Sequence, residues 1–407
     1  MTLVFDVGKT NKKCIVFDAQ YRVVWETSVS IPETVDEDGH ACEDLAALSD
    51  WLHSTLHAVM SDARFQIDTV NCTAYGASFV HLDQDGRVLT PLYNYLKPYP
   101  DALHRQFFDT WGAEQNLALE TASPVMDSLN SGLQLYRLKY EQPQVFEIIK
   151  WSVHLPQYVA WLLQTFLQKE NKPLPVSEIT SIGCHTLLWD FIRQDYHRWV
   201  YEEGMERILP PITNQPGMGL HDSSAALIPY LATVQEPFLL LSTGTWCISM
   251  NPFNTEPLTA AELEQDCLCY LTYEGKPVKS ARYFGGHEHE KAVQQMAREH
   301  QAPADFYKKA SLVPQSSAEA DYLRFMTQLI EKQAISTQLA IGQSGVRTIF
   351  VDGGFSKNEV YMRLLSAAFP HMNVFAAEVA QATALGAALA VHVAGPIPPD
   401  LIAFKPY

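Results

Sequence analysis

The chain lacks any apolar stretch near the length needed to cross a membrane, and Met1 leads directly into a strand-like run rather than into a signal peptide. We therefore expect a cytoplasmic protein without a membrane partner. The 407 residues hold 29 Lys and Arg against 46 Asp and Glu, a formal net charge of −17. This shortage of basic residues disfavours nucleic acid as a partner, because nucleic-acid binding depends on cations that neutralise phosphates.

Cysteine is scarce, and its pattern favours free thiols. The seven cysteines are scattered, and Cys14 and Cys247 fall inside predicted strands, where a free thiol behaves as a small apolar side chain. Cys267 and Cys269 lack a second pair at metal-binding spacing. In residues 287–290 His and Glu alternate, so their side chains cannot share one side of a helix or strand. We expect these four residues to form a solvated or nucleotide-edge loop rather than a metal site.

The length and the apolar content favour two domains. A chain of 407 residues exceeds what a single core usually supports, and 47% hydrophobic residues suffice for two cores. The chain changes character around residues 230–237, where a loop-rich stretch gives way to a new apolar run. We therefore predict an N-terminal domain over residues 1–232 and a C-terminal domain over residues 233–407.

Apolar periodicity predicts the main elements. The expected elements are strands at 3–7, 14–18 and 22–29, a helix at 44–60, a strand-and-turn stretch at 69–92 and a helix-rich region at 117–166. The pair Asp85-Gly86 is a hairpin signal, and a new strand meander begins at Phe238. The proline-rich end, residues 394–407, is expected to lie across the surface as a tail.

Three segments, far apart in the chain, read as a strand that breaks into a loop of small residues. Residues 3–13 and 238–245 turn straight into a second strand-like run, as a β-hairpin does, whereas residues 348–356 open into a helical pattern. Glycine and hydroxyl residues at such tips expose backbone N–H groups to an anion. Together the three loops indicate an actin-like ATP site, with the nucleotide held between two domains.

A Walker A loop is the competing interpretation of Gly8-Lys9-Thr10. That motif requires a glycine where this chain has Leu3, and a helix where residues 14–18 read as a strand. The interpretation therefore fails on two counts.

Further segments complete a pattern that resembles the FGGY family of carbohydrate kinases, most closely its rhamnulokinase and fuculokinase branch. They are residues 75–83, 129–136, 180–186 and 219–226, of which the last is the most specific. With the three loops, the resemblance runs nearly end to end. It implies an α/β protein with the two-domain actin/hexokinase-like (ribonuclease H-like) ATPase fold and an interdomain cleft. The implied activity is ATP-dependent phosphorylation of a ketose, L-rhamnulose or L-fuculose first, with ATP and Mg²⁺ as cofactors.

The resemblance assigns the chemistry to few residues. Asp222 would be the catalytic base that accepts the proton of the sugar hydroxyl, since phosphoryl transfer otherwise needs mainly positioning and charge stabilisation. Asp222 could instead, or in addition, begin a helix, because Asp-Ser-Ser-Ala-Ala is a good helix start. Asp6 would hold Mg²⁺ through water, with an ordinary turn aspartate as the alternative.

The nucleotide would contact all three loops. The β- and γ-phosphates would meet the first loop at Gly8, Thr10, Asn11 and Lys13. The second cradle would be Thr243, Gly244 and Thr245, and the third loop would approach the nucleotide at Gly353 and Gly354. Lys9 departs from the small or hydroxyl residue usual in the family, and could contact phosphate or point to solvent. In so acidic a chain the nucleotide would also depend on local cations, a metal ion and Lys9, Lys12 and Lys13.

The sugar pocket is where the pattern departs from the branch. The expected substrate contacts are Gly76, Ser78, Tyr95, His221 and Asp222. His221 could equally be a structural histidine. Ser78 replaces an acidic residue, and residues 93–97, which end in Lys97, replace the usual aromatic-x-Asp-x-Arg stretch. Because carboxylates are strong acceptors for sugar hydroxyls, their loss keeps xylulose, or another sugar or polyol, open as the substrate.

Two functions of other classes stay open. A non-catalytic sugar or nucleotide sensor could use the same fold, although the presence of both Asp6 and Asp222 argues against degeneration. An actin-like ATPase with a protein partner is the second, and the sugar-kinase segments between residues 75 and 134 argue against it. We expect a small-molecule sugar as substrate, and a monomer or homodimer.

Overall fold

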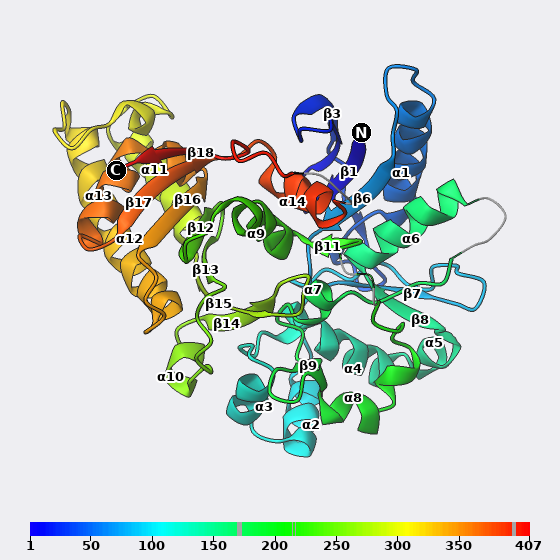
Figure 1. Cartoon of the computed structure of the whole chain (residues 1–407). Coiled ribbons are helices and arrows are strands. Elements are labelled where there is room, and N and C mark those ends of the chain that lie inside the picture. The colour runs from blue at the N-terminus through cyan, green and yellow to red at the C-terminus, as the bar shows by residue number, and fades with distance from the viewer. Residues whose placement is uncertain (169–172, 214, 216, 393–395) are drawn as a thin grey trace. The chain divides into compact units, whose positions relative to one another are not determined.

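The computed structural model describes residues 1–168, 173–213, 215, 217–392 and 396–407 (Figure 1). The chain forms two compact units. Unit 1 comprises Met1–Thr233, Cys269–Lys276 and Ala380–Pro398, and unit 2 comprises Val234–Leu268, Pro277–Val379 and Pro399–Tyr407. The sequence analysis did not predict the two segments that return to unit 1 from the second half of the chain.

The strands and helices have the following bounds. The strands are β1 (Thr2–Val7), β2 (Lys12–Phe17), β3 (Val23–Val29), β4 (Thr34–Val35), β5 (Ala41–Cys42), β6 (Thr69–Ala74), β7 (Phe79–Leu82), β8 (Trp151–His154), β9 (Trp189–Asp190), β10 (Asp195–Tyr196), β11 (Leu220–His221), β12 (Phe238–Thr243), β13 (Cys247–Asn251), β14 (Cys267–Leu271), β15 (Pro277–Tyr283), β16 (Thr348–Gly353), β17 (Asn373–Glu378) and β18 (Ala403–Pro406). The α-helices are α1 (Leu45–Met60), α2 (Asp101–Trp111), α3 (Glu114–Glu120), α4 (Ser131–Glu141), α5 (Pro143–Ile148), α6 (Leu155–Leu167), α7 (Ile179–Ile182), α8 (Arg198–Glu202), α9 (Asp222–Thr233), α10 (Ala260–Leu263), α11 (Gly285–Glu299), α12 (Ser317–Ile341), α13 (Glu359–Ala368) and α14 (Ala382–Ala390).

Unit 1 is built on a five-stranded sheet in the order β11-β6-β1-β2-β3. Strands β1, β2 and β3 form an antiparallel meander, while β6 runs parallel to β1 and β11 parallel to β6. The predicted meander and the predicted helix α1 are confirmed. The helix begins after Asp44, whose carboxylate accepts the N–H of Ala47 at 2.9 Å, as a helix cap does.

Successive side chains along a strand point to opposite faces of the sheet. Different helices cover these two faces. Leu3 and Phe5 belong to a buried core that α1 and α6 complete. On the other face Asn71 donates to the carbonyl of Ala387 in α14 at 2.7 Å. Helix α14 also packs against α9, β1 and β6. A second core in unit 1, around Trp199, lies among α2, α4 and α8.

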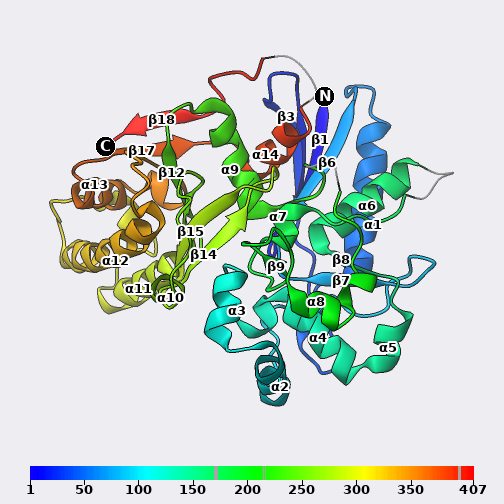
Figure 2. The same cartoon turned by 60° about the horizontal axis from the view of Figure 1, so that its bottom comes forward.

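Unit 2 is built on a seven-stranded sheet in the order β14-β15-β13-β12-β16-β17-β18. Strands β12 and β13 form an antiparallel hairpin, and β16 pairs parallel to β12, so unit 2 repeats the connection of β1, β2 and β6. The predicted hairpin at Phe238 is thus confirmed. Helices α11, α12 and α13 lie side by side (Figure 2), and α12 packs against β13 and β15.

The end of the chain adds a strand to one prediction. Part of the expected surface tail forms β18, whose residues are exposed and which pairs antiparallel with β17 at the edge of the sheet. The ring of Phe404 packs 4.5 Å from that of Phe350, and an edge position tolerates Pro406, which has no N–H to donate to a further strand. Residues 394 and 395 of the predicted tail lie outside the described residues. None of the described helices is both long and apolar enough to span a bilayer.

Candidate functional site

The loop between β1 and β2 is a tight turn. The N–H of Gly8 donates to the carbonyl of Asn11 at 3.0 Å. A Cβ at Gly8 would lie 2.9 Å from that oxygen, so a larger residue would force the loop to move. Thr10 and Asn11 are exposed. The hairpin is therefore a tight turn with exposed residues at its tip, and its binding of an anion stays a prediction.

Asp6 and Lys13 face each other across this hairpin, as paired residues of β1 and β2. The Lys13 ammonium donates to the side-chain oxygen of Gln381 at 2.9 Å. Burial and, next, the charge of Asp222 raise the pKa of Asp6 to about 7, while Lys13 opposes this rise. Two carboxylates that repel each other in a partly buried site are stabilised by a divalent cation, and Mg²⁺ prefers such oxygen ligands. Asp6 and Asp222 therefore fit a Mg²⁺ that phosphate oxygens and waters would complete.

The sequence His221-Asp222 forms the junction between β11 and α9. Helix α9 begins at Asp222, which agrees with the predicted helix start. Its carboxylate accepts the N–H of Ser223 at 2.6 Å and lies 3.3 Å from Nε2 of His221. The carboxylate side chain is still 38% exposed, so a ligand can reach it.

His221 lies buried between Gly76 and Cys184. Its Nε2 is 3.1 Å from the Cys184 sulfur, and burial lowers the pKa of the ring, although Asp222 opposes this. Its Nδ1 has no hydrogen-bond partner among the described residues. A Cβ at Gly76 would lie 2.7 Å from the imidazole, so only glycine permits this approach. The structure thus brings together Gly76, His221 and Asp222, three of the five predicted substrate contacts.

Glu178 is linked through Thr180 to the junction between β11 and α9 at His221. The backbone N–H of His221 donates to the hydroxyl of Thr180 at 3.0 Å, and Glu178 is hydrogen-bonded to both the hydroxyl and the N–H of Thr180. Glu178 is fully buried, and this burial raises the pKa of its carboxyl from about 4.5 to about 8. Sequence reasoning missed Glu178, because a lone glutamate in a loop carries no motif.

The raised pKa of Glu178 predicts a pH-dependent stability. Between about pH 4.5 and 8 the folded state keeps a proton that the unfolded state releases, so the free energy of unfolding falls as pH rises through this window. The variant Glu178→Gln should lack this fall and be more stable than wild type at pH 8 by at least about 1 kcal/mol. Urea unfolding at pH 5 and pH 8 measures the difference, with the exposed Glu236→Gln as control. Parallel pH profiles of wild type and Glu178→Gln would contradict the assignment.

Ser78 and Tyr95 have different surroundings. Ser78 is 1% exposed, and its hydroxyl donates to the carbonyl of Tyr93 at 3.4 Å. Tyr95 is half-buried, and burial, then the charges of Asp222 and Glu33, raise the pKa of its hydroxyl. The charge of the Asp222 carboxylate therefore acts on the Tyr95 hydroxyl, whereas the Ser78 hydroxyl is hydrogen-bonded within the protein.

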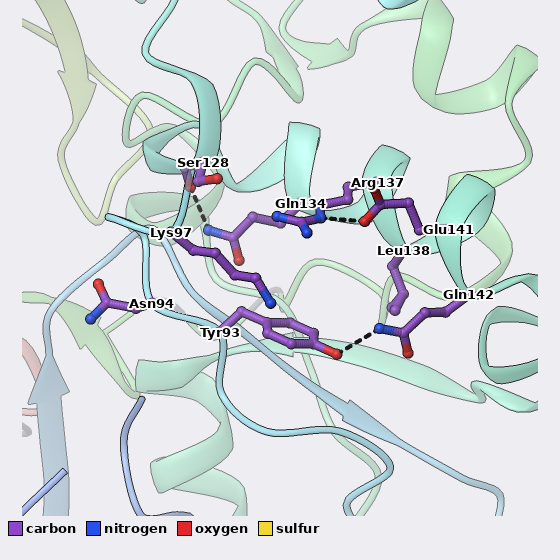
Figure 3. Close-up of a pocket in the computed structure, with 9 residues that line it drawn as sticks. All are labelled: Tyr93, Asn94, Lys97, Ser128, Gln134, Arg137, Leu138, Glu141 and Gln142. Carbon is purple, nitrogen blue, oxygen red and sulfur yellow. Dashed lines mark hydrogen bonds and ion pairs between the residues drawn. The ribbon is translucent and has the colours of Figure 1, made fainter. Parts of the chain in front are cut away.

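Lys97 is an internal cation. Its ammonium lies 2.6 Å from Asp36 and 2.8 Å from Asp38. Figure 3 shows Lys97 beside Tyr93 at a pocket that Gln134 and its neighbours complete. At about 30 Å³ this pocket has room for about one water molecule and not for a sugar.

Two lysines at the first loop are held in ion pairs. Lys9 is paired with Glu33 at 2.5 Å and lies 5.6 Å from the ring of Tyr75, so it is neither extended into solvent nor unpaired. Lys12 is 1% exposed and lies 2.6 Å from Glu43, so its prediction as a nucleotide cation is wrong. An ammonium that is buried and paired with a carboxylate is not free to approach a phosphate.

The second and third loops meet in unit 2. The N–H of Gly354 donates to the carbonyl of Thr243 at 2.9 Å, and the N–H of Phe355 donates to the Thr243 hydroxyl at 3.0 Å. Gly353 has φ +85°, and a Cβ there would lie 2.0 Å from the Thr243 carbonyl. The backbone at Gly353 therefore requires glycine, and the two predicted loops form one cradle.

A pocket of about 520 Å³ opens beside this cradle. It is lined in part by Gly244, Gly286, His289, Tyr307, Gly354 and Asn358. His289 and Asn358 are both hydrogen-bonded to the hydroxyl of Tyr322, at 3.0 and 2.7 Å. Burial lowers the pKa of His289 to about 4, so the ring is neutral near pH 7. Thr245 and Gly353 do not line this pocket.

Residues 287–290 correct another prediction, because they lie in the first turns of α11 and not in a loop. Their side chains point to separate partners: His287 stacks on Phe284 at 4.3 Å, and Glu288 accepts from Tyr283 and Lys332 at 2.8 Å each. No three His, Cys, Asp or Glu side chains gather as a metal site in the described part of the chain. Sequence reasoning placed this segment near the nucleotide but missed His289 as a pocket residue.

Comparison with known proteins gives matches along most of the chain. The FGGY family of carbohydrate kinases, N-terminal domain, matches residues 1–202, and two FGGY C-terminal domain families match residues 235–320 and 318–395. A rhamnulokinase of Halalkalibacterium halodurans is 22% identical over 271 residues, 61% of this chain and 55% of that protein. The chain spans about half the length of the curated relatives it matches.

Two solved structures share the architecture. A carbohydrate kinase from Novosphingobium aromaticivorans has a TM-score of 0.80 and 23% identity, over 100% of this chain and 93% of that chain. A xylulose kinase from Lactobacillus acidophilus has a TM-score of 0.76 and 16% identity, over 96% of this chain and 89% of that chain. The likeness confirms the predicted α/β, two-domain actin/hexokinase-like fold.

Proposed function

Because the chain belongs to the FGGY family of carbohydrate kinases, we propose that it transfers the γ-phosphoryl group of ATP to a hydroxyl of a sugar. The observation that carries this proposal is Asp222. Its carboxylate is 38% exposed at the first residue of α9, beside His221, and its charge acts on Asp6. A reachable carboxylate next to a second, protonatable one suits a reaction that needs one proton acceptor and one cation site.

The chemistry is assigned to groups in unit 1. Asp222 accepts the proton of the attacking hydroxyl as negative charge leaves the γ-phosphoryl group, so a carboxylate is a sufficient base. His221 is assigned to a sugar hydroxyl, because its ring lies beside the exposed carboxylate of Asp222 and against Gly76. Gly76 leaves the space that this imidazole occupies. Asp6 would hold Mg²⁺, and the bound ion would supply charge neutralisation at the phosphates.

The nucleotide is assigned to the three loops. The backbone from Gly8 to Asn11 and the ammonium of Lys13 bind the β- and γ-phosphates. In unit 2 the peptide backbone at Gly244 and Gly354 contacts the phosphates of the nucleotide. The adjoining pocket of about 520 Å³ is large enough for adenosine.

The substrate we propose is L-rhamnulose or L-fuculose. The support is the similarity to rhamnulokinases, whose sequences match over more than half of the chain. Xylulose is the next candidate, because Ser78, Tyr95 and Lys97 depart from the residues usual in that branch, and Lys97 is already paired with Asp36 and Asp38. We further propose that the enzyme acts in the cytoplasm as a monomer or homodimer.

Release of ADP in a coupled assay tests the proposal. With Mg·ATP, L-rhamnulose or L-fuculose should raise the rate at least about tenfold over the rate without sugar, because binding of the sugar completes the catalytic arrangement and excludes water from the γ-phosphoryl group. Xylulose, aldoses and polyols complete the panel. Full-rate ATP hydrolysis that no sugar increases would overturn the kinase assignment, and binding of sugar and ATP without any turnover would favour the sensor.

A further inference from the structure

A chain of buried polar contacts lies beneath the first hairpin, and the proposed chemistry does not use it. Lys12, Glu43 and Tyr75 are 1%, 3% and 7% exposed. The ammonium of Lys12 lies 2.6 Å from Oε1 of Glu43, and the hydroxyl of Tyr75 donates to Oε2 of Glu43 at 3.0 Å. Both oxygens of the carboxylate are therefore engaged by side chains from other parts of the sequence.

The two ends of this network reach the two ligand segments. The Lys12 ammonium also donates to the backbone carbonyl of Lys9 at 3.2 Å, inside the first loop. At the other end Tyr75 directly precedes Gly76, whose backbone lies against His221. The backbone N–H of Tyr75 donates to the carbonyl of Val7, the last residue of β1, at 3.2 Å. The loop and the sugar segment are thus joined by one continuous set of hydrogen bonds.

Two further contacts brace the same set. The Lys9 ammonium lies 5.6 Å from the ring of Tyr75 while it pairs with Glu33. The backbone of Glu43 forms an isolated β-bridge with Leu92, shortly before Tyr95. The Glu43 carboxylate is therefore held at a fixed position between the loop and the segment that carries Tyr95.

A buried ion pair is a poor device for stability alone. Removing two charges from water costs free energy that their attraction only partly returns, and apolar residues of similar volume are often as stable. What the pair provides is a fixed geometry. An ammonium and a carboxylate whose hydrogen bonds are all made can adopt few relative positions. The network is suited to setting the position of the Lys9 carbonyl, and with it the neighbouring N–H groups of the loop.

We propose that Lys12, Glu43 and Tyr75 are positioning residues that fix the first phosphate loop relative to the sugar segment at Gly76. The roles of those two ends rest on the proposed function. None of the three residues acts on the reacting atoms directly, so their loss should lower kcat without a comparable rise in the KM for ATP.

The variant Tyr75→Phe removes one hydroxyl and keeps the ring. Hydrogen–deuterium exchange of the peptide that contains residues 8–11 should increase, and kcat should fall by about tenfold. Tyr140→Phe is the matched control, because the Tyr140 hydroxyl donates to Glu203 at 3.1 Å, and Glu203 pairs with Lys139 at 2.5 Å. This second Lys-Glu-Tyr set has no contact with the loops in the described hydrogen bonds, so exchange at residues 8–11 should not change.

The triple variant Lys12→Met/Glu43→Leu/Tyr75→Phe separates positioning from stability, because it leaves no buried hydroxyl without an acceptor. It should unfold at a temperature close to that of wild type, yet show the fast loop exchange and the low kcat of Tyr75→Phe. Wild-type exchange at residues 8–11 in Tyr75→Phe would overturn the inference even if the triple variant did not fold. An inactive wild-type chain would overturn the proposed function instead, and the exchange measurement would still decide the positioning role.

Discussion

Asp222→Asn is expected to abolish phosphoryl transfer while ATP affinity stays within a few-fold of wild type. The substitution keeps the shape of the side chain but removes the proton acceptor, and a general base typically contributes about 10²–10⁴-fold in rate. Asparagine is as good as aspartate at a helix start, so α9 should still begin at residue 222. The carbonyl of asparagine can also still accept the N–H of Ser223, which donates to Asp222 at 2.6 Å.

Turnover is measured by ADP release with the best sugar of the panel, and ATP affinity by calorimetry. The thermal unfolding midpoint of the variant serves as the control for folding. Ser223→Ala provides a matched change at the next residue, which leaves the carboxylate in place. Turnover of Asp222→Asn near the wild-type value would remove Asp222 as the base.

Gly244→Val is expected to weaken ATP binding tenfold or more, which corresponds to about 1.4 kcal/mol. The nearest protein atom to a Cβ at Gly244 is the carbonyl of Trp246, at 3.8 Å, so the protein itself has room for a side chain. A branched side chain would instead occupy the space through which phosphate approaches the backbone. Gly354 offers the same test, because a Cβ there would lie 4.0 Å from the Thr243 carbonyl.

Gly353→Val is the contrasting variant. With φ +85° and a Cβ 2.0 Å from the Thr243 carbonyl, the substitution should lower the free energy of unfolding by several kcal/mol, about 3 or more. Loss of binding at Gly353 would therefore report on folding, whereas loss at Gly244 in a stable protein reports on the ligand. Unchanged ATP affinity in well-folded Gly244→Val and Gly354→Val would exclude these loops from the nucleotide site.

Local features of this fold could be predicted because their causes are local. The apolar runs on either side of Gly8 and Gly244 are short and follow one another directly, and a tight turn is the simplest connection that pairs them. The start of α1 at Asp44 follows from a side chain that caps its own helix. The approach of Gly76 to His221 was accessible only through the family resemblance, since the two residues are far apart in sequence.

The features that were missed depend on pairing across long sequence distances. The sequence shows Lys12 as one of several lysines near a phosphate loop, and only the fold brings Glu43 to it. His289 is a pocket residue because residues 287–290 lie in α11 rather than in the expected loop, and the helix directs that ring toward Tyr322. The assignments of individual residues to ATP, Mg²⁺ and sugar remain predictions, and the variants above address them.

Helix α14 has a consequence for the order in which the protein is assembled. It comes from residues near the C-terminal end, yet it covers β1 and β6, the strands that start the chain's first sheet, and Asn71 bonds to its Ala387. Domains usually fold one after another as they emerge during synthesis. Here the face of β1 and β6 that α14 covers cannot be completed until Ala382–Ala390 has left the ribosome. The first unit to be translated is therefore completed among the last.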